Sequence, residues 1–274
     1  MIEFRYTKSE RKKMNERLPQ EHIIQTENTL KVVGMLRKHT GKKVLIKDIK
    51  ELSDDPVFSG AEFYLGATYN GPESIIVYLN LYHPNTCEAT FVHEILHIIL
   101  EYEGFPEIII NQAIARTLPP QFSRVLPKLQ SFFSSTIDHP EIFKRMESEF
   151  ELNLSPYYEI QVQQKLNRFQ KGLKTESEKN QQYYFFRQQD ILIGLEYFFF
   201  PKNYKERVLQ AFNRFYPDAY ASCLSLYKRV RKVGFNSSKS SYQSAKMIKT
   251  HIIRYGERKK VGIFNRMWEA LEVK

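Results

Sequence analysis

The segment Phe91-Val92-His93-Glu94-Ile95-Leu96-His97-Ile98-Ile99-Leu100 decides how the rest of the sequence is interpreted. Its apolar residues predict a buried helix, and two histidines four positions apart lie on one face of such a helix, one turn from each other. Both imidazoles can then bind one Zn²⁺ at about 2.0–2.1 Å. Glu94 stands next to His93, where its carboxylate reaches a metal-bound water instead of the metal. The pattern predicts a zinc site with His93 and His97 as ligands and Glu94 as the general base.

The residues before this helix predict a small sheet. Three stretches have β-strand character: Lys43–Ile49, Glu62–Tyr69 and Ser74–Leu81, the last rich in Ile, Val and Tyr. An amphipathic helix is expected over His22–Lys38, and the strongly charged first 20 residues are expected to form a helix or a frayed arm. These segments together predict a short twisted sheet close to the helix that carries the histidines.

The chain after the histidine helix is expected to be helical to its end, with no strand from Glu107 onward and a last helix over Val261–Val273. The fold class we expect is α+β: a small twisted sheet packed on the HExxH helix, followed by a mostly α-helical C-terminal region. We expect two domains, residues 1–154 with the sheet and the chemistry, and residues 155–274 as a basic all-helical region.

Charge is unevenly distributed along the chain. The net charge is +10, yet residues 1–150 hold 18 Lys/Arg and 20 Asp/Glu, whereas residues 151–274 hold 23 and 11. The C-terminal excess suits a solvated helical surface, or an acidic partner such as nucleic acid. The two cysteines, Cys87 and Cys223, form no CxxC pair and are expected to be reduced, which excludes a disulfide scaffold. No apolar run suits a membrane helix or signal peptide, so we expect a cytoplasmic protein with no membrane partner.

Through His93-Glu94-Ile95-Leu96-His97 on a helix just after Ser74–Leu81, the chain resembles the zincin metallopeptidases. It is also similar to their ImmA/IrrE-type branch, which has an Ile/Val-rich strand, a short loop and an F-x-x-H-E-x-x-H helix in this order. Here the phenylalanine is Phe91, one position nearer to the first histidine. The similarity covers roughly residues 20–150. It implies a zinc-dependent peptidase in which a strand beside the metal helix pairs with the substrate, so Ser74–Leu81 is the expected edge.

A catalytic zinc has three protein ligands and one open position, so a third ligand is needed. His139 is the leading candidate, because two intervening helical stretches can carry the chain away from the site and return it. We expect His139 to precede a helix that begins with Pro140, a residue suited to the first helical position. Asp138 is then available to orient an imidazole through its second nitrogen.

Two glutamates are alternatives for the third ligand. Glu107 and Asn111 have the E-x-x-x-N spacing of the E-x-x-A-N pattern that follows the HExxH helix in ImmA/IrrE-type proteins, with Ile110 in place of the alanine. Glu107 would have to double back at once after the end of the helix. Glu101 is the weaker alternative, because two helical turns separate it from His93 by about 12 Å.

Two functions from different classes are compatible with these features. The first is a cytoplasmic zinc metallopeptidase that hydrolyses a peptide bond in a protein substrate with metal-activated water and Glu94 as base, the basic region docking the substrate. The second is a nucleic-acid- or protein-binding module in which the HExxH site is structural or vestigial. The residue that would stabilise the oxyanion stays open among 17 tyrosines, of which Tyr157 and Tyr158 follow the His139 segment.

Overall fold

The structure is a computed structural model of the chain, and it describes residues 26–52, 65–81, 83–175 and 180–274. The fold class is α+β, as predicted from the sequence. Contacts divide the chain into two compact units: the described residues of Met1–Glu103 with Ile142–Tyr157, and Gly104–Glu141 with Tyr158–Lys274. The helix or arm expected over the first 20 residues lies outside the described residues, and the domain division at residue 154 stays a prediction.

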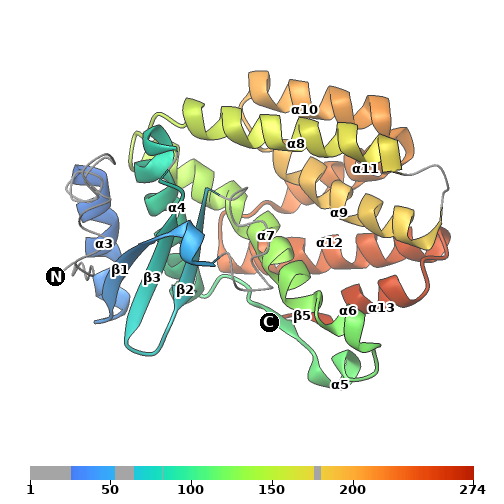
Figure 1. The fold of residues 1–274 in the computed structure, drawn as a ribbon, viewed down its shortest axis with the longest axis horizontal. Coiled ribbons are helices and arrows are strands. Elements are labelled where there is room, and N and C mark those ends of the chain that lie inside the picture. The colour runs from blue at the N-terminus through green and yellow to red at the C-terminus, as the bar shows by residue number, and fades with distance from the viewer. Residues whose placement is uncertain (1–25, 53–64, 82, 176–179) are drawn as a thin grey trace. The chain divides into compact units, whose positions relative to one another are not determined.

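The first unit contains a three-stranded sheet of order β1-β3-β2 (Figure 1). β1 (Lys43–Asp48) pairs in parallel with β3 (Ser74–Leu79), and β2 (Gly66–Asn70) pairs antiparallel with β3. Every second residue of β3 is completely buried, as a strand with one covered face requires. A strand therefore forms in each of the three β-like stretches. β1 and β3 begin where predicted and end one and two residues earlier, and β2 ends one residue later than predicted, while residues 62–64 of its stretch lie outside the described residues.

The position of β3 shows that the expected substrate edge was wrong. Ser74–Leu81 was expected at the edge, but β3 lies between the other two strands, and Val77 pairs with Ile46 on one side and with Thr68 on the other. The backbone groups of β3 therefore form hydrogen bonds with a strand on each side, and β1 and β2 are the outer strands of the described sheet. Alternation of apolar residues reports a buried face, and it is the same for a central strand and an outer strand of a sheet covered on one face.

Two helices of the first unit pack against each other: α3 (Glu27–His39) and α4 (Cys87–Tyr102). The side chain of Thr26 caps α3 by accepting a hydrogen bond from the backbone N–H of Thr29. α4 follows a short 3₁₀ turn, η5 (Pro84–Thr86), and contacts both β2 and β3. Its apolar residues are buried almost all round, so α4 is the central helix of this unit.

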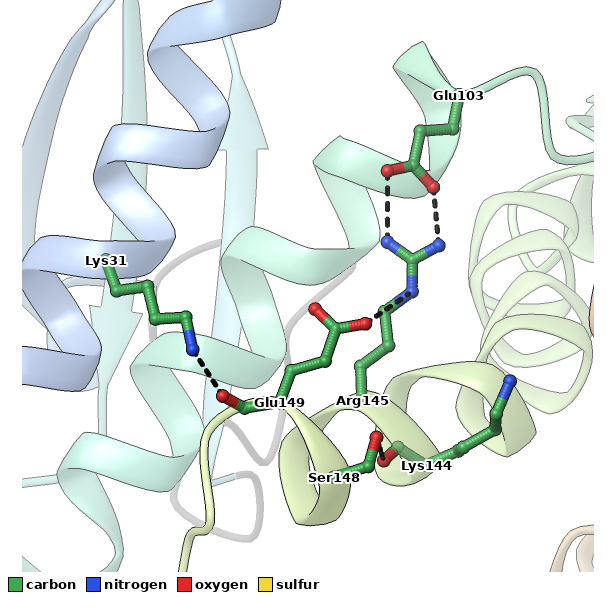
Figure 2. Close-up of polar contacts among 6 residues, drawn as sticks. All are labelled: Lys31, Glu103, Lys144, Arg145, Ser148 and Glu149. Atoms are coloured by element: carbon green, nitrogen blue, oxygen red, sulfur yellow. Dashed lines mark hydrogen bonds and ion pairs between the residues drawn. The ribbon is translucent and has the colours of Figure 1, made fainter.

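The C-terminal part of α7 (Leu126–Ser148) is fastened to α4 within the first unit (Figure 2). The guanidinium of Arg145 donates to both carboxylate oxygens of Glu103, at 3.0 and 2.6 Å. Lys31 of α3 donates to the backbone carbonyl of Glu149, which directly follows α7. A two-bonded guanidinium–carboxylate pair fixes direction as well as distance, so it holds this part of α7 in one orientation on α4.

α7 continues through Pro140, so the helix start expected at this residue was wrong. Proline inside a helix costs ~3 kcal/mol, because it lacks an N–H and crowds the preceding turn. Ile137, Ile142 and Met146 lie on either side of Pro140 and are completely buried. Burying each such side chain contributes ~1.5–3 kcal/mol, enough together to offset the cost of the proline.

The second unit is mainly helical and is arranged around α9 (Gln181–Tyr197). α9 packs against α10 (Lys202–Phe215), α11 (Pro217–Val233), α12 (Ser238–Arg258) and α13 (Ile263–Glu269). The other helices are α8 (Ser155–Thr175), which begins in the first unit, and the short α5 (Gln112–Ala115) and α6 (Pro120–Ser123). All residues from Asp190 to Tyr197 are buried, as expected of a helix surrounded by others.

A buried ionic cluster lies on the polar residues of α9. Asp190 is completely buried and receives Nη2 of Arg187 at 3.1 Å and Nε of Arg168, from α8, at 3.0 Å. The guanidinium of Arg187 also lies over the ring of Tyr216, 3.4 Å from its centroid. Charge pairing and an aromatic face together offset part of the cost of burying these charges.

The expectation of no strand after Glu107 was wrong. β4 (Ile108–Ile110) pairs antiparallel with β5 (Leu271–Val273), where the last predicted helix was expected to continue. Glu107 and Lys274 extend the pair by exchanging two backbone hydrogen bonds of 3.1 and 2.9 Å. Strands of three residues are too short to show a period of two, so sequence patterning does not detect them.

In the described ranges, no helix has both the length and the apolar character that crossing a membrane requires.

Candidate metal centre

α4 brings the two histidines of the HExxH segment together in the first unit. The ring centroids of His93 and His97 are 4.9 Å apart, with the ring planes nearly perpendicular. His93 is only 3% exposed, and His97 is half-buried. Two imidazoles one helical turn apart, inside an otherwise apolar helix, are suited to share a metal ion.

His139 adds a third imidazole to this pair. One ligand atom from each of His93, His97 and His139 lies within 4.8 Å of the other two. Phe143, one turn after His139 on the continuous helix α7, packs its ring 5.5 Å from that of His93 within the first unit.

Three imidazoles are a donor set that fits a divalent metal ion. Neutral imidazole suits zinc and several other transition metals. Nitrogens that share a tetrahedral zinc are roughly 3.3 Å apart, so small side-chain rotations bring these three atoms to coordinating distance. Three protein nitrogens leave a fourth position for water or substrate, which is the composition of catalytic zinc sites and not of closed structural ones.

Glu196 of α9 orients His139 within the second unit. Its Oε1 lies 2.8 Å from Nδ1 of His139, and the two side chains are 8% and 14% exposed. A carboxylate that accepts a hydrogen bond from Nδ1 places the proton of the neutral ring there, so Nε2 is the atom that could bind a metal ion. Burial lowers the pKa of the Lys165 amine on α8, and the charge of Glu196 partly opposes this lowering.

Glu94 is held by a threonine of β2 in the first unit. Oγ1 of Thr68 donates to Oε2 of Glu94 at 2.6 Å. This contact requires β2 to lie close to α4, and Gly66 permits it. A Cβ at Gly66 would lie 2.4 Å from Cγ2 of Thr90 and 3.1 Å from Cγ of Glu94. The absence of a side chain at one position of β2 therefore sets how near the carboxylate lies to the strand.

Aromatic rings surround His93 on the side of α7. The ring of Tyr157 lies 5.6 Å from that of His93, and Phe143 and Tyr157 are 5.9 Å from each other. Both aromatic residues are almost fully buried. They keep water from this side of His93 and strengthen electrostatic interactions of the imidazole.

The other ligand candidates lie differently. Glu107 is exposed at the start of β4, and its backbone is engaged with Lys274. Asn111 caps α5 through the N–H of Ile114 and donates to Glu272 on β5, so its role is structural. Glu101 is exposed near the end of α4. Among the described residues, the group of possible ligand atoms that includes His93 and His97 is completed by His139 and contains neither glutamate.

The two cysteines are free and buried, in agreement with the expected reduced state. Burial raises the pKa of the Cys87 thiol to about 11, and that of Cys223 rises further from its ordinary value for the same reason. Both stay protonated at neutral pH and are neither thiolate ligands nor nucleophiles.

Four residues of the site escape analysis of the sequence: Gly66, Thr68, Phe143 and Glu196. Phe143 could have been found, because it stands four positions after His139 and a helix through Pro140 places both on one face. Glu196 is 57 positions from His139 and lies in an apolar run, and Thr68 is one polar residue of a half-buried strand. Neither has a spacing signal, since tertiary packing alone brings it to its partner.

Comparison with protein-family models, with curated proteins and with solved structures finds no match to this chain.

Proposed function

We propose that this chain is a zinc-dependent metallopeptidase that hydrolyses peptide bonds in a protein substrate. One observation carries the proposal: the carboxylate between two metal-binding histidines is held in place by Thr68, while a third imidazole completes the donor set. A structural zinc site needs no such carboxylate beside it. The resemblance of the HExxH segment to zincins supports the same class of reaction.

The chain supplies ligands, a base and an orienting group. His93, His97 and His139 would hold the ion, which when bound polarises the scissile carbonyl and lowers the pKa of water. Thr68 fixes Oε2 of Glu94, and we assign Oε1 as the atom that takes a proton from the attacking water. Glu94 then returns this proton to the leaving amine. Glu196 keeps His139 in the tautomer that ligation requires.

β2 is the strand that we assign to the substrate, in place of β3. The N–H of Gly71 donates to the carbonyl of Ser74 opposite it, and the N–H of Asn80 donates to the carbonyl of Leu65 opposite it, at 2.9 Å each. Along an antiparallel strand, residues that are hydrogen-bonded to the partner strand alternate with residues whose backbone N–H and C=O point away from it. Since Leu65 and Gly71 are of the first kind, the backbone groups of Gly66, Thr68 and Asn70 point away from β3. Within the described residues no strand pairs with this side of β2, and an extended peptide can add here, beside Glu94.

Metal content tests the first half of the proposal. Elemental analysis of the purified chain should give close to one zinc per molecule, and His93→Ala should lose it. A folded wild-type chain that takes up no zinc, even from added ZnCl₂, would refute the proposal. The remaining function would then be the binding of a nucleic acid or a protein.

Glu94→Gln tests the second half. The amide keeps the shape of the carboxylate and still accepts from Thr68, but it cannot take a proton. A library of proteome-derived peptides, incubated with each variant and analysed by mass spectrometry, should show new termini with the wild type and at most ~1% of them with Glu94→Gln. Zinc content should be equal in the two. Loss of zinc from Glu94→Gln, or equal cleavage by both, would contradict the role of Glu94.

A further inference from the structure

α11 and α12 form a hairpin of exceptional charge in the second unit. Gly234, at φ 80°, ends α11, and Ser237 begins α12 with a capping box. Residues 217–260 contain eleven Lys/Arg and only two acids, Asp218 and Glu257. Asp218 is already bound to Lys259 at 2.8 Å. The hairpin therefore carries a net charge of +9, of the +12 that residues 151–274 carry together.

Part of this charge converges on the seam between the two helices. On α11, Oγ of Ser222 lies 2.8 Å and Nη2 of Arg229 lies 2.5 Å from the two ring nitrogens of His251 on α12. Arg254 and Arg258 follow His251 at three and seven positions, which places them on the same stripe of α12. All three arginines are exposed, and among the described residues none of them forms an ion pair. We call Arg229, Arg254 and Arg258 the arginine seam.

The pKa of His251 reflects both its burial and the positive electrostatic potential of the arginine seam. Burial lowers its pKa to about 4, and Arg229, Arg258 and Arg254 all add to the lowering. The neutral ring accepts from Arg229 at Nδ1, so it carries its hydrogen on Nε2 and donates to Ser222. This tautomer has no lone pair directed at the hydroxyl, which excludes Ser222 and His251 as a nucleophile and base. The seam is thus a binding surface and not a second hydrolytic site.

We propose that the arginine seam binds the phosphate backbone of a nucleic acid. The planar guanidinium is the side chain best matched to phosphate oxygens. Other cations are distributed along α12, which is ~31 Å long at 1.5 Å per residue, and a single small anion would contact only a few of them. A nucleic-acid strand, with one phosphate every ~3.4 Å, can contact cations along the whole helix. A lipid surface fits less well, because the exposed large apolar residues of the described chain, Leu30, Tyr69, Tyr102 and Val125, all lie outside the hairpin.

Fluorescence anisotropy with labelled 30-nucleotide single-stranded DNA, single-stranded RNA and duplex DNA tests this inference on the full chain, with EDTA present so that the metal centre plays no part. At least one of the three should bind, and its log K should fall linearly with log salt concentration. The triple variant Arg229→Gln/Arg254→Gln/Arg258→Gln should bind at least tenfold more weakly at 150 mM salt. Its salt slope should be smaller by about 2–3, because three phosphate contacts are lost.

A control variant separates the seam from net charge. Lys202→Gln/Lys205→Gln/Arg214→Gln removes the same charge from α10 in the same unit and should weaken binding no more than about twofold. Equal loss in both triple variants would overturn the proposal. So would binding without salt dependence, full competition by millimolar inorganic phosphate, or binding to phosphatidylserine vesicles with no nucleic acid bound. Arg254→Gln/Arg258→Gln, which keeps the contact of Arg229 with His251, provides the same test if the triple variant does not fold.

Discussion

Replacing Gly66 with alanine tests how β2 positions the carboxylate of Glu94. The new Cβ would lie 2.4 Å from Cγ2 of Thr90, where ordinary contact begins at about 3.4 Å. Thr90 is only 2% exposed, so its side chain is enclosed by neighbouring atoms. β2 and α4 must therefore separate by about 1 Å, at a cost of ~1–3 kcal/mol in unfolding free energy.

The separation also reaches the hydrogen bond of Glu94. Thr68 follows Gly66 by two residues on the same strand, so the 2.6 Å contact with Oε2 lengthens beyond 3.5 Å and is lost. If the proposed function holds, cleavage of the peptide library falls at least tenfold, because misplacing a reacting group by 1 Å is costly. Zinc content stays near one, because the nearest atoms to the new Cβ belong to Thr90, Glu94 and Tyr78 and not to a histidine.

Urea denaturation, elemental analysis and peptide cleavage measure these three effects. Gly34→Ala is the matched control: Gly34 lies inside α3, and nothing is within 4 Å of its added Cβ. This variant should be more stable than the wild type by up to ~1 kcal/mol. If Gly66→Ala is as stable as the wild type, β2 does not lie against α4 at this distance. The proposed positioning of Glu94 by Thr68 would then be refuted as well.

Three further predictions test other parts of the structure. Glu196→Ala should lower zinc affinity by about 10–100-fold in a chelator competition, and Glu196→Gln, which still accepts from His139, should lose less; equal affinity in all three would mean that Glu196 does not orient the ligand. Arg145→Ala should reduce the unfolding free energy by ~1 kcal/mol, because its side chain is 14% exposed and bonds Glu103 twice, whereas Lys47→Ala breaks a pair with both side chains more than 40% exposed and should change little. The neutral His251 protonates less readily in the folded chain than in the unfolded one, where its pKa is ~6.5, so its contribution to stability is complete above that pH and is lost as the pH falls toward 4. His251→Gln should therefore show a smaller decrease in unfolding free energy between pH 7 and pH 4.5 than the wild type, and identical decreases would contradict the contacts described for Ser222 and the arginine seam.

The sequence predicts the elements with a strong local period and misses those that depend on distant partners. The HExxH helix, two of the strands and the α+β class follow from apolar spacing in segments of six residues or more. β4 and β5 are too short for such a signal, and the central position of β3 depends on pairing, which alternation does not encode. Pro140 misleads for a different reason: its local preference for a helix start is overridden by buried neighbours on both sides.

The candidate site divides in the same way. Spacing on one helix predicts His93, Glu94 and His97, and the two helical stretches that can return the chain to the site predict His139. What holds these residues in place was not predicted, because Thr68, Gly66 and Glu196 act through strand–helix and helix–helix contacts. Spacing on a helix identifies donors, and tertiary packing selects their supports.

The buried cluster of Asp190 with Arg168 and Arg187 limits how this chain can evolve. Exchanging Asp190 alone strands the buried guanidinium of Arg187, a loss of ~3–5 kcal/mol that is a large part of the ~5–15 kcal/mol by which most domains are stable. Joint replacement by apolar residues of similar volume is tolerated far better. Homologous sequences should therefore either keep the acid with its arginines or lack them together, and a lineage can pass between these states only by near-simultaneous changes.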